Sequence, residues 1–171
     1  MAKTAKIHGQ GEGDTSWFVR DRFGLFIHWG LYSLAARHEW VQNNEHIPND
    51  VYDSRYFKRF DPDLYDPSAW ARAASGAGMK YFVVTTKHHE GFCIWDTRLT
   101  DFKAPNTPAG RDLLKPMVKA FREENMRVGL YHSLLDWHHP HYVLDHHYGP
   151  YRDHKDRETM NKGRNQKLYA K

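Results

Sequence analysis

Apolar segments alternate with helical patterns along the first part of the chain. A short helix is expected over Asp14–Arg22, with Asp14 or Thr15 as its N-cap. The segment "FGLFIHWG", Phe23–Gly30, is almost continuously apolar and ends in glycine, which is typical of a buried strand. Residues Leu31–Tyr65 are polar and aromatic without a clear period, so they predict a long loop with short helical pieces.

The rest of the chain repeats helix and strand twice more. A proline near the start, apolar residues at helical spacing and terminal glycines predict a helix over Pro67–Ser75, and the β-branched run after it predicts a strand over Lys80–Lys87. The amphipathic segment "RDLLKPMVKAFREENM" predicts a helix, and "RVGLYHSLL" predicts a strand over Arg127–Leu135. A His-rich loop then extends to about Arg157, and "ETMNKGRNQKLYAK" begins a last helical pattern.

Apolar strands that alternate with helices indicate an α/β fold with a parallel sheet covered on its outer side. We therefore expect one domain over residues 1–171, with about three parallel strands and outer helices. In such folds the ligand lies beyond the carboxyl ends of the strands. The candidate site should therefore lie where the three predicted strands end.

Polar and titratable side chains recur at all three predicted strand ends. A single histidine on a strand is more often structural than functional, but a repeat at three ends favours a site. His88 and His89 would point to opposite faces if the strand continued through them, and Glu90-Gly91 supplies a bend that would bring both to one pocket. The three groups are His28-Trp29-Gly30, Lys87-His88-His89-Glu90 and Tyr131-His132-Ser133, the last followed by Asp136-Trp137.

Composition narrows the class of partner. The N-terminus has no apolar core of a secretory signal and no segment is apolar enough to span a membrane, so we expect a cytoplasmic chain without a membrane partner. The net charge of +4 is spread along the chain and does not predict nucleic-acid binding.

As the single cysteine, Cys93 is predicted to be a small buried side chain. The 25 aromatic residues and 13 histidines suit a sugar ligand, because rings pack on C–H groups and imidazoles bind hydroxyls.

The sequence contains no nucleotide-binding glycine loop, which predicts that no nucleotide cofactor is needed. Zinc would need three converging ligands, which the strand ends or "HHPHYVLDHHY" could supply, yet no metal-binding spacing occurs, so we expect no metal. A solvated loop is the preferred interpretation of His138–His147, and residues 138–157 are expected to be mobile. Cleavage of a glycosidic bond generally uses two carboxyl groups. The carboxylates nearest the strand ends are Glu39, Glu90, Asp96 and Asp136.

Four segments together resemble the N-terminal part of the catalytic barrel of glycoside hydrolase family 29, the α-L-fucosidases. They are "RFGLFIHWGLYS", "HEW", "KYFVVTTKHHEGFCIWDTRLTDF" and "RVGLYHSLLDWHHPHY". The resemblance implies a retaining glycosidase that removes terminal L-fucose from fucosylated glycans or glycosides without a metal. It also implies a fucose pocket formed by His28, Glu39, Trp40, His88, His89 and Tyr131.

The sequence also departs from this family's pattern. The family's nucleophile follows strand four of the barrel and its acid/base lies later, and neither segment has a counterpart here. The expected fold is therefore an incomplete TIM-type (β/α) barrel, a truncated form whose open inner face and strand edges predict a homo-oligomer. Within this chain the candidate catalytic carboxylates are Asp136 and Glu90, and Glu39 is the third choice. The alternatives are an inactive fucose-binding remnant and one part of a split fucosidase.

Overall fold

Three parallel strands form the centre of the fold in the computed structural model, which describes residues 14–169. The strands are β1 (Gly24–Ile27), β2 (Tyr81–Lys87) and β3 (Arg127–His132), in the order β1-β2-β3. Gly24 pairs with Tyr81, and Tyr81 pairs with Arg127, so the three strands start level with one another. This parallel register brings all three carboxyl ends to one edge of the sheet, as the sequence predicts.

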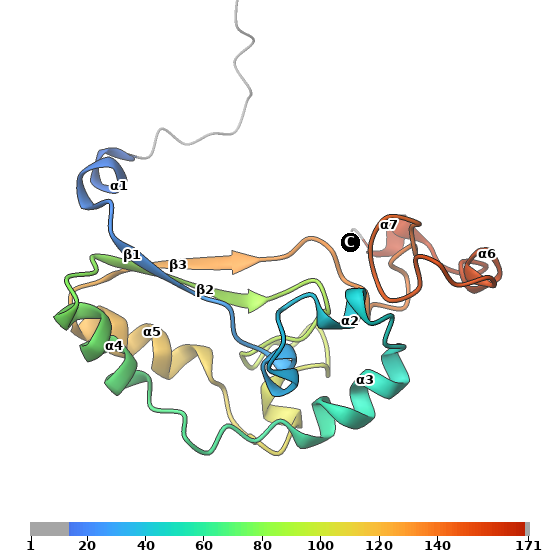
Figure 1. Ribbon diagram of the computed structural model, residues 1–171, viewed down its shortest axis with the longest axis horizontal. Coiled ribbons are helices and arrows are strands. Elements are labelled where there is room, and N and C mark those ends of the chain that lie inside the picture. Colours follow the sequence, from blue (N-terminus) through green and yellow to red (C-terminus); the bar gives the residue numbers. More distant parts are fainter. Residues whose placement is uncertain (1–13, 170–171) are drawn as a thin grey trace, which may run out of the picture.

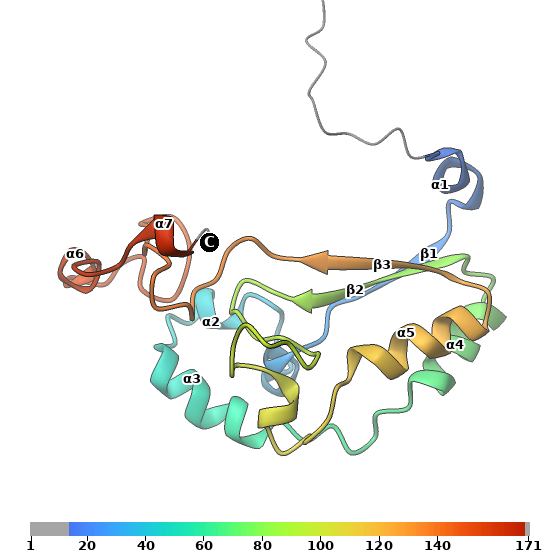
Figure 2. The ribbon, with the colours of Figure 1, turned by 180° about the vertical axis from the view of Figure 1, so that it is seen from behind.

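Helices α4 (Pro67–Gly76) and α5 (Leu114–Glu123) pack on one face of the sheet (Figures 1 and 2). The core lies between these layers, where the Phe82 ring stacks on Phe121 with 3.7 Å between centroids. Across the part of the chain that the structure describes, no helix covers the middle of the opposite face, where Phe26 is exposed. This arrangement agrees with a partial barrel that has helices on its outer side.

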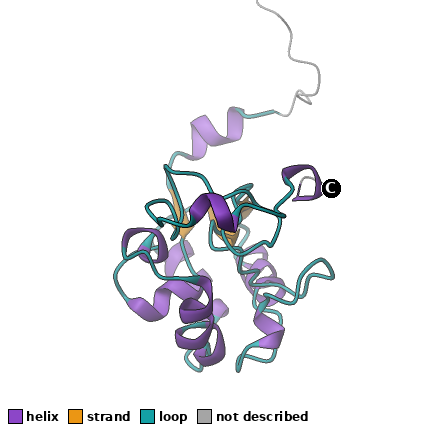
Figure 3. Ribbon diagram, turned by 90° about the vertical axis from the view of Figure 1, so that its right-hand side faces the viewer, coloured by secondary structure: helices purple, strands orange, loops and turns teal. Residues whose placement is uncertain are grey.

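The long segment after β1 folds into short helices, as expected. These helices and the loops around them lie beyond the carboxyl end of the sheet (Figure 1), and the view from that side has helices and loops in front of the strands (Figure 3). Helix α1 lies at the opposite end, and α6 and α7 follow the His-rich loop (Figure 1). The bounds are Ser16–Asp21 for α1, Leu31–Ala35 for the 3₁₀ helix η1, Val41–Asn44 for α2, Asn49–Arg55 for α3, Phe57–Arg59 for η2, Ala104–Asn106 for η3, Arg157–Met160 for α6 and Gln166–Tyr169 for α7.

Two strands are shorter than the sequence predicts. β1 ends at Ile27 rather than Gly30, because the Trp29 N–H donates to the side-chain oxygen of Thr85 (3.1 Å) instead of a backbone carbonyl. β3 ends at His132 rather than Leu135: the Ser133 N–H still donates to the Lys87 carbonyl (2.9 Å), but the Ser133 hydroxyl donates to the carbonyl of Leu135 in the turn that follows (2.9 Å). At both strand ends, hydrogen bonds between side chain and backbone take over where the ladder stops.

Two helices also differ from their predicted ranges. Helix α5 begins at Leu114, after the N-cap residue Leu113, and Asp112 Oδ1 accepts from the Lys115 N–H of its first turn (2.8 Å). The predicted last helix is wrong as a continuous element. Gly163 has a φ of +92°, and the chain forms the two single turns α6 and α7 on either side of it.

The His-rich loop is more buried than a solvated loop would be. Trp137, Tyr142 and Leu144 are buried, and His138 stacks on Phe102 with 3.8 Å between ring centroids. The His138 Nε2 atom also lies 3.0 Å from Asp53 Oδ2 of α3. The expectation of solvation is therefore wrong for this part of the loop, whereas the mobility of residues 138–157 stays a prediction.

Some of the predictions concern the two ends of the chain. Residues 1–13, which carry the N-terminal segment interpreted above, and residues 170 and 171 at the end of the predicted last helix lie outside the described residues. Within residues 14–169, no helix is both long enough and apolar enough to cross a bilayer. Cys93 is buried as a free thiol, as predicted.

Candidate active site

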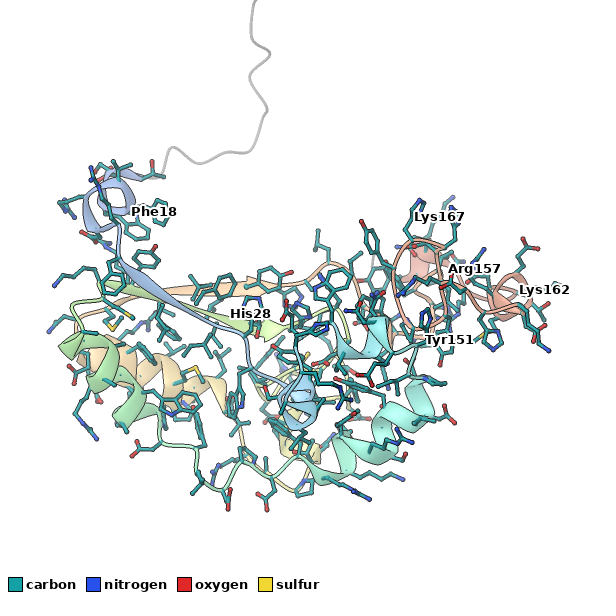
Figure 4. The ribbon with its side chains drawn as sticks, in the orientation of Figure 1. Phe18, His28, Tyr151, Arg157, Lys162 and Lys167 are labelled. Carbon is teal, nitrogen blue, oxygen red and sulfur yellow. The ribbon has the colours of Figure 1, made fainter. Side chains whose placement is uncertain are left out.

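The three strand ends bring His28, His88 and Tyr131 together. The His28 ring lies 5.8 Å from the His88 ring, and the Tyr131 ring lies 6.0 Å from His88 and 6.3 Å from His28, measured between centroids. Figure 4 shows His28 where β1 leaves the sheet and the loops begin. One ring from each strand end therefore contributes to a single cluster.

His88 and His89 lie on the same side of the strand end, as the predicted bend requires. β2 has a register irregularity between Thr85 and Lys87 and then ends, and Gly91 takes a φ of +90°. The two imidazole rings are consequently only 4.2 Å apart. A regular strand would have placed them on opposite faces.

His88 is 4% exposed, and its Nδ1 atom has no hydrogen-bond partner among the described residues. Burial, together with positive charge on His89 or His28, lowers the pKa of His88 to about 3. The imidazole is therefore neutral at pH 7, with one donor nitrogen and one acceptor nitrogen. Because Nδ1 is enclosed, Nε2, which is not among the enclosed atoms and has no partner among the described residues, is the His88 nitrogen suited to a ligand hydroxyl.

His89 is fixed by the loop after β3. Its Nδ1 lies 2.7 Å from Ser133 Oγ, and that hydroxyl donates its own hydrogen to the Leu135 carbonyl. Ser133 must therefore accept from His89, which assigns the proton to Nδ1 and leaves Nε2 as an acceptor when the ring is neutral. Burial lowers the pKa of His89, so the neutral form is favoured. The sequence predicted His89 as a site residue but not the serine that orients it.

Glu39 and Trp40 come from the turn before α2 and lie beside the histidines. Glu39 shares a pocket of about 200 Å³ with His28 and Tyr32. The pocket is smaller than the roughly 300 Å³ at which sites for drug-sized ligands begin, so it suits one small ring. The Trp40 ring packs edge-on against His89, with 5.0 Å between centroids. The structure thus gathers all six predicted pocket residues in one region.

Glu90 is buried behind the pocket rather than exposed in it. The Tyr52 hydroxyl donates to Glu90 Oε2, and Oε1 lies against Gly30, where a Cβ would come within 3.0 Å of it. Burial raises the pKa of Glu90 to about 8. Glu90 therefore connects β2 to α3 and packs against the residue before η1, which carries Tyr32.

Asp136 forms a largely buried ion pair with Lys87, with 3.0 Å between Oδ2 and Nζ. Its other oxygen accepts from the backbone N–H groups of His138 (3.2 Å) and His139 (2.9 Å). A side chain at position 91 would collide with this carboxylate, which explains Gly91 in addition to its positive φ. Asp136 therefore fixes the loop after β3 against the end of β2.

The fourth carboxylate, Asp96, lies apart from the cluster and pairs with Lys103 at 2.8 Å. Of the predicted carboxylates, only Glu39 lines the small pocket. Among residues 14–169, no three His, Cys, Asp or Glu side chains are arranged to hold a metal ion. A wider hollow of about 900 Å³ lies along α5 and is lined by residues such as Leu114, Val118 and Arg122, away from the strand ends.

Besides Ser133, two further residues of the cluster were not predicted from sequence. Tyr32 donates or accepts a hydrogen bond with Thr85 Oγ1 (2.9 Å), and its ring lies 5.4 Å from His88. Trp137 is buried beneath Trp40, with 5.6 Å between ring centroids. Both stand within the quoted segments that resemble the α-L-fucosidases, but a local sequence pattern does not indicate that a loop residue folds back over a strand end.

The Alpha-L-fucosidase family model matches residues 6–168. The chain belongs to the alpha-L-fucosidase family. The tissue alpha-L-fucosidase of Bos taurus is 36% identical over 146 residues, which cover 76% of this chain and 31% of that protein. The alpha-L-fucosidase of Dictyostelium discoideum is 31% identical over 152 residues, 75% of this chain and 33% of that protein. The chain thus spans about a third of the length of these relatives of the alpha-L-fucosidase family.

Solved structures of alpha-L-fucosidases share the fold. Alpha-L-fucosidase isoenzyme 1 from Paenibacillus thiaminolyticus is 55% identical with a TM-score of 0.79, over 84% of this chain and 34% of that chain. The Lactobacillus casei enzyme in complex with alpha-L-fucose product is 34% identical with a TM-score of 0.68, over 74% and 43% of the two chains. These structures confirm the resemblance seen in the sequence motifs and agree with a partial barrel.

Proposed function

We propose that the cluster at the strand ends binds a terminal α-L-fucosyl unit of a glycan or glycoside, and that the chain acts in hydrolysis of that unit by a retaining mechanism. The observation that carries this proposal is the convergence of His28, His88 and Tyr131 from three different strands on one cluster, in which His28 also lines the small pocket beside Glu39. The family of the chain supports the choice of sugar.

The residues of the pocket have the chemistry that a deoxy sugar requires. Neutral His88 and His89 each have a second ring nitrogen, Nε2, without a partner among the described residues, which can bond to ring hydroxyls, and the Glu39 carboxylate accepts from another. Trp40 supplies an aromatic surface on which the C–H groups and the methyl group of fucose pack. The small volume of the pocket favours a single sugar ring over an elongated ligand.

Calorimetry with L-fucose and an aryl α-L-fucoside assay test the proposal. We expect His28→Ala to weaken fucose binding at least tenfold, because a hydrogen bond buried by the ligand is lost. His132→Ala is the matched control, since His132 is an exposed histidine that packs against Trp95. Equal loss of affinity in the two variants, or no binding by the unmodified chain, would overturn the proposal.

The environments of the carboxylates favour a second candidate function, fucose binding without turnover by this chain alone. Retaining hydrolysis uses two carboxyl groups about 5 Å apart. Glu90 and Asp136 direct their oxygens to Tyr52 and Lys87, so Glu39 is the candidate that faces the pocket. Fucose binding with no release of aryl alcohol would support this second function. Turnover that is lost in Asp136→Ala, Glu90→Ala or Glu39→Ala would instead support the enzyme.

We also propose that the chain self-associates through its open sheet. Among the described residues, β1 and β3 pair only with β2, so each has one unpaired edge, and Phe26 is exposed on the uncovered face. Light scattering at micromolar concentration should therefore give a mass above that of one chain. A stable monomer with native circular dichroism would contradict self-association but would leave the sugar pocket unaffected.

A further inference from the structure

Trp40 connects the small pocket to a second aromatic residue outside it. The Tyr148 ring lies 5.7 Å from Trp40, at an interplanar angle of 68°. Trp40 follows Glu39, which lines the pocket, while Tyr148 comes from the His-rich loop. A ligand that extends from the pocket past Trp40 therefore reaches Tyr148.

Tyr148 is 52% exposed, although the backbone around it is firmly bonded. Asp145 Oδ1 accepts from the backbone N–H groups of His147 (2.6 Å) and Tyr148 (2.8 Å). The next residue, Gly149, is buried and donates its N–H to Asn43 Oδ1 of α2 (2.8 Å). The backbone that carries the exposed ring is therefore fixed at Tyr148 and on both sides of it.

Close packing fixes the same segment against the site. Gly149 has a φ of +98°, and a Cβ at this position would lie 3.1 Å from Trp137, so a larger residue would displace the loop from the buried indole. Further along, the Tyr151 hydroxyl accepts from the Asn49 N–H at the start of α3 (2.8 Å), and Figure 4 shows Tyr151 between the loop and α3. These contacts attach the loop to both short helices that follow the pocket turn.

We propose that Tyr148 forms, with the outer part of Trp40, a second sugar subsite that receives the neutral pyranose to which the fucosyl unit is linked. The subsite rests on the proposed function, because it presupposes a sugar in the pocket. An exposed, positioned phenol ring packs on the C–H face of a pyranose. His147, whose ring lies 6.2 Å from Tyr148, is an exposed imidazole within reach of its hydroxyls.

The proposal predicts that Tyr148 discriminates between a monosaccharide and an oligosaccharide. Calorimetry would compare L-fucose, 2′-fucosyllactose and a fucosyl-N-acetylglucosamine disaccharide. For the oligosaccharide that binds more tightly, we expect Tyr148→Ala to weaken binding roughly threefold to tenfold, which is the size of an aromatic packing contribution. Binding of L-fucose should not change, and Tyr148→Phe should retain most of the oligosaccharide affinity because the ring is kept.

Phe18→Ala is the matched control, because Phe18 is an equally exposed aromatic residue on α1 at the opposite end of the sheet. A thermal melt of each variant verifies folding. The subsite is overturned if both oligosaccharides bind no more tightly than L-fucose, or if Tyr148→Ala weakens monosaccharide and oligosaccharide equally. Failure of the unmodified chain to bind L-fucose would instead refute the proposed function on which the subsite rests.

Discussion

The two halves of β2 are both buried, but by different kinds of contact. In the first half, Phe82 and Val84 face α4 and α5 and are fully buried among apolar side chains. In the second half and the turn after it, the buried side chains are polar: Thr85, Thr86, Lys87, His88 and Glu90. One strand therefore carries an apolar core at its start and a polar cluster at its end.

The polar half is stable because its groups find partners on other elements. Thr85 bonds to Tyr32 and Trp29, Thr86 donates to the carbonyl of Tyr131 at 2.8 Å, and Lys87 pairs with Asp136. The His88 ring is the exception in this half, because it has no hydrogen-bond partner among the described residues. The comparison teaches that the partnered polar groups fix the strand end, whereas the imidazole of His88 is left available for a ligand.

The largest expected loss of stability comes from a substitution in the apolar half of β2. Phe82→Ala removes a fully buried ring that stacks on Phe121, and we expect the free energy of unfolding to fall by about 3–5 kcal/mol. Phe26→Ala is the control, because Phe26 is the same residue type in the same sheet but 48% exposed on the open face. Urea unfolding of both variants measures the difference. Similar losses would mean that the open face is covered in solution.

The next largest loss of stability should come from removing the ion pair of the polar half of β2. Lys87→Met leaves the Asp136 carboxylate largely buried without its cation, so the free energy of unfolding should fall by about 3 kcal/mol. The double variant Lys87→Met/Asp136→Asn should lose less than the sum of the two single variants, because no charge is left unpaired. Urea unfolding of the four chains gives the coupling energy. Strict additivity would contradict the role assigned to this pair.

The dependence of stability on pH tests the burial of Glu90 in the polar half of β2. Burial raises its pKa from 4.5 to about 8, so between these values the folded chain holds a proton that the unfolded chain has lost. Stability should therefore decrease by roughly 2–3 kcal/mol as the pH rises from about 6 to 9. Glu90→Gln cannot titrate and should show a flatter dependence in thermal melts. Parallel curves for the two proteins would refute the raised pKa.

The smallest expected effect concerns His88, where stability should change with pH in the opposite direction. Its pKa falls from 6.5 to about 3 on burial, so in this interval the unfolded chain binds a proton that the folded chain does not. Stability should decrease by about 2 kcal/mol as the pH falls from about 7 to 5. His88→Gln should remove this part of the decrease, whereas His146→Gln, at an exposed loop position, should retain it. Equal slopes in the two variants would contradict the buried neutral imidazole.

Much of the fold could be predicted because its signals are local. Strands β1, β2 and β3 were found from apolar runs, and α4 was found from its proline, helical period and glycines. The errors are at ends where a side chain competes with the backbone, such as Thr85 beyond β1, or where one residue interrupts a pattern, such as Gly163 between α6 and α7. Such competition depends on partners distant in sequence, which a local pattern does not contain.

The sequence by itself determined the parallel α/β fold, the edge of the sheet where the polar motifs meet and the side chains that gather at the strand ends. Only the tertiary structure decided the environment of each carboxylate. Glu90 and Asp136 look equivalent in sequence, yet Tyr52 from α3 encloses one and Lys87 pairs with the other, while Glu39 faces the pocket. The physical reason is that periodicity fixes which residues reach an edge, whereas burial, charge and hydrogen bonding depend on segments that meet there only after folding.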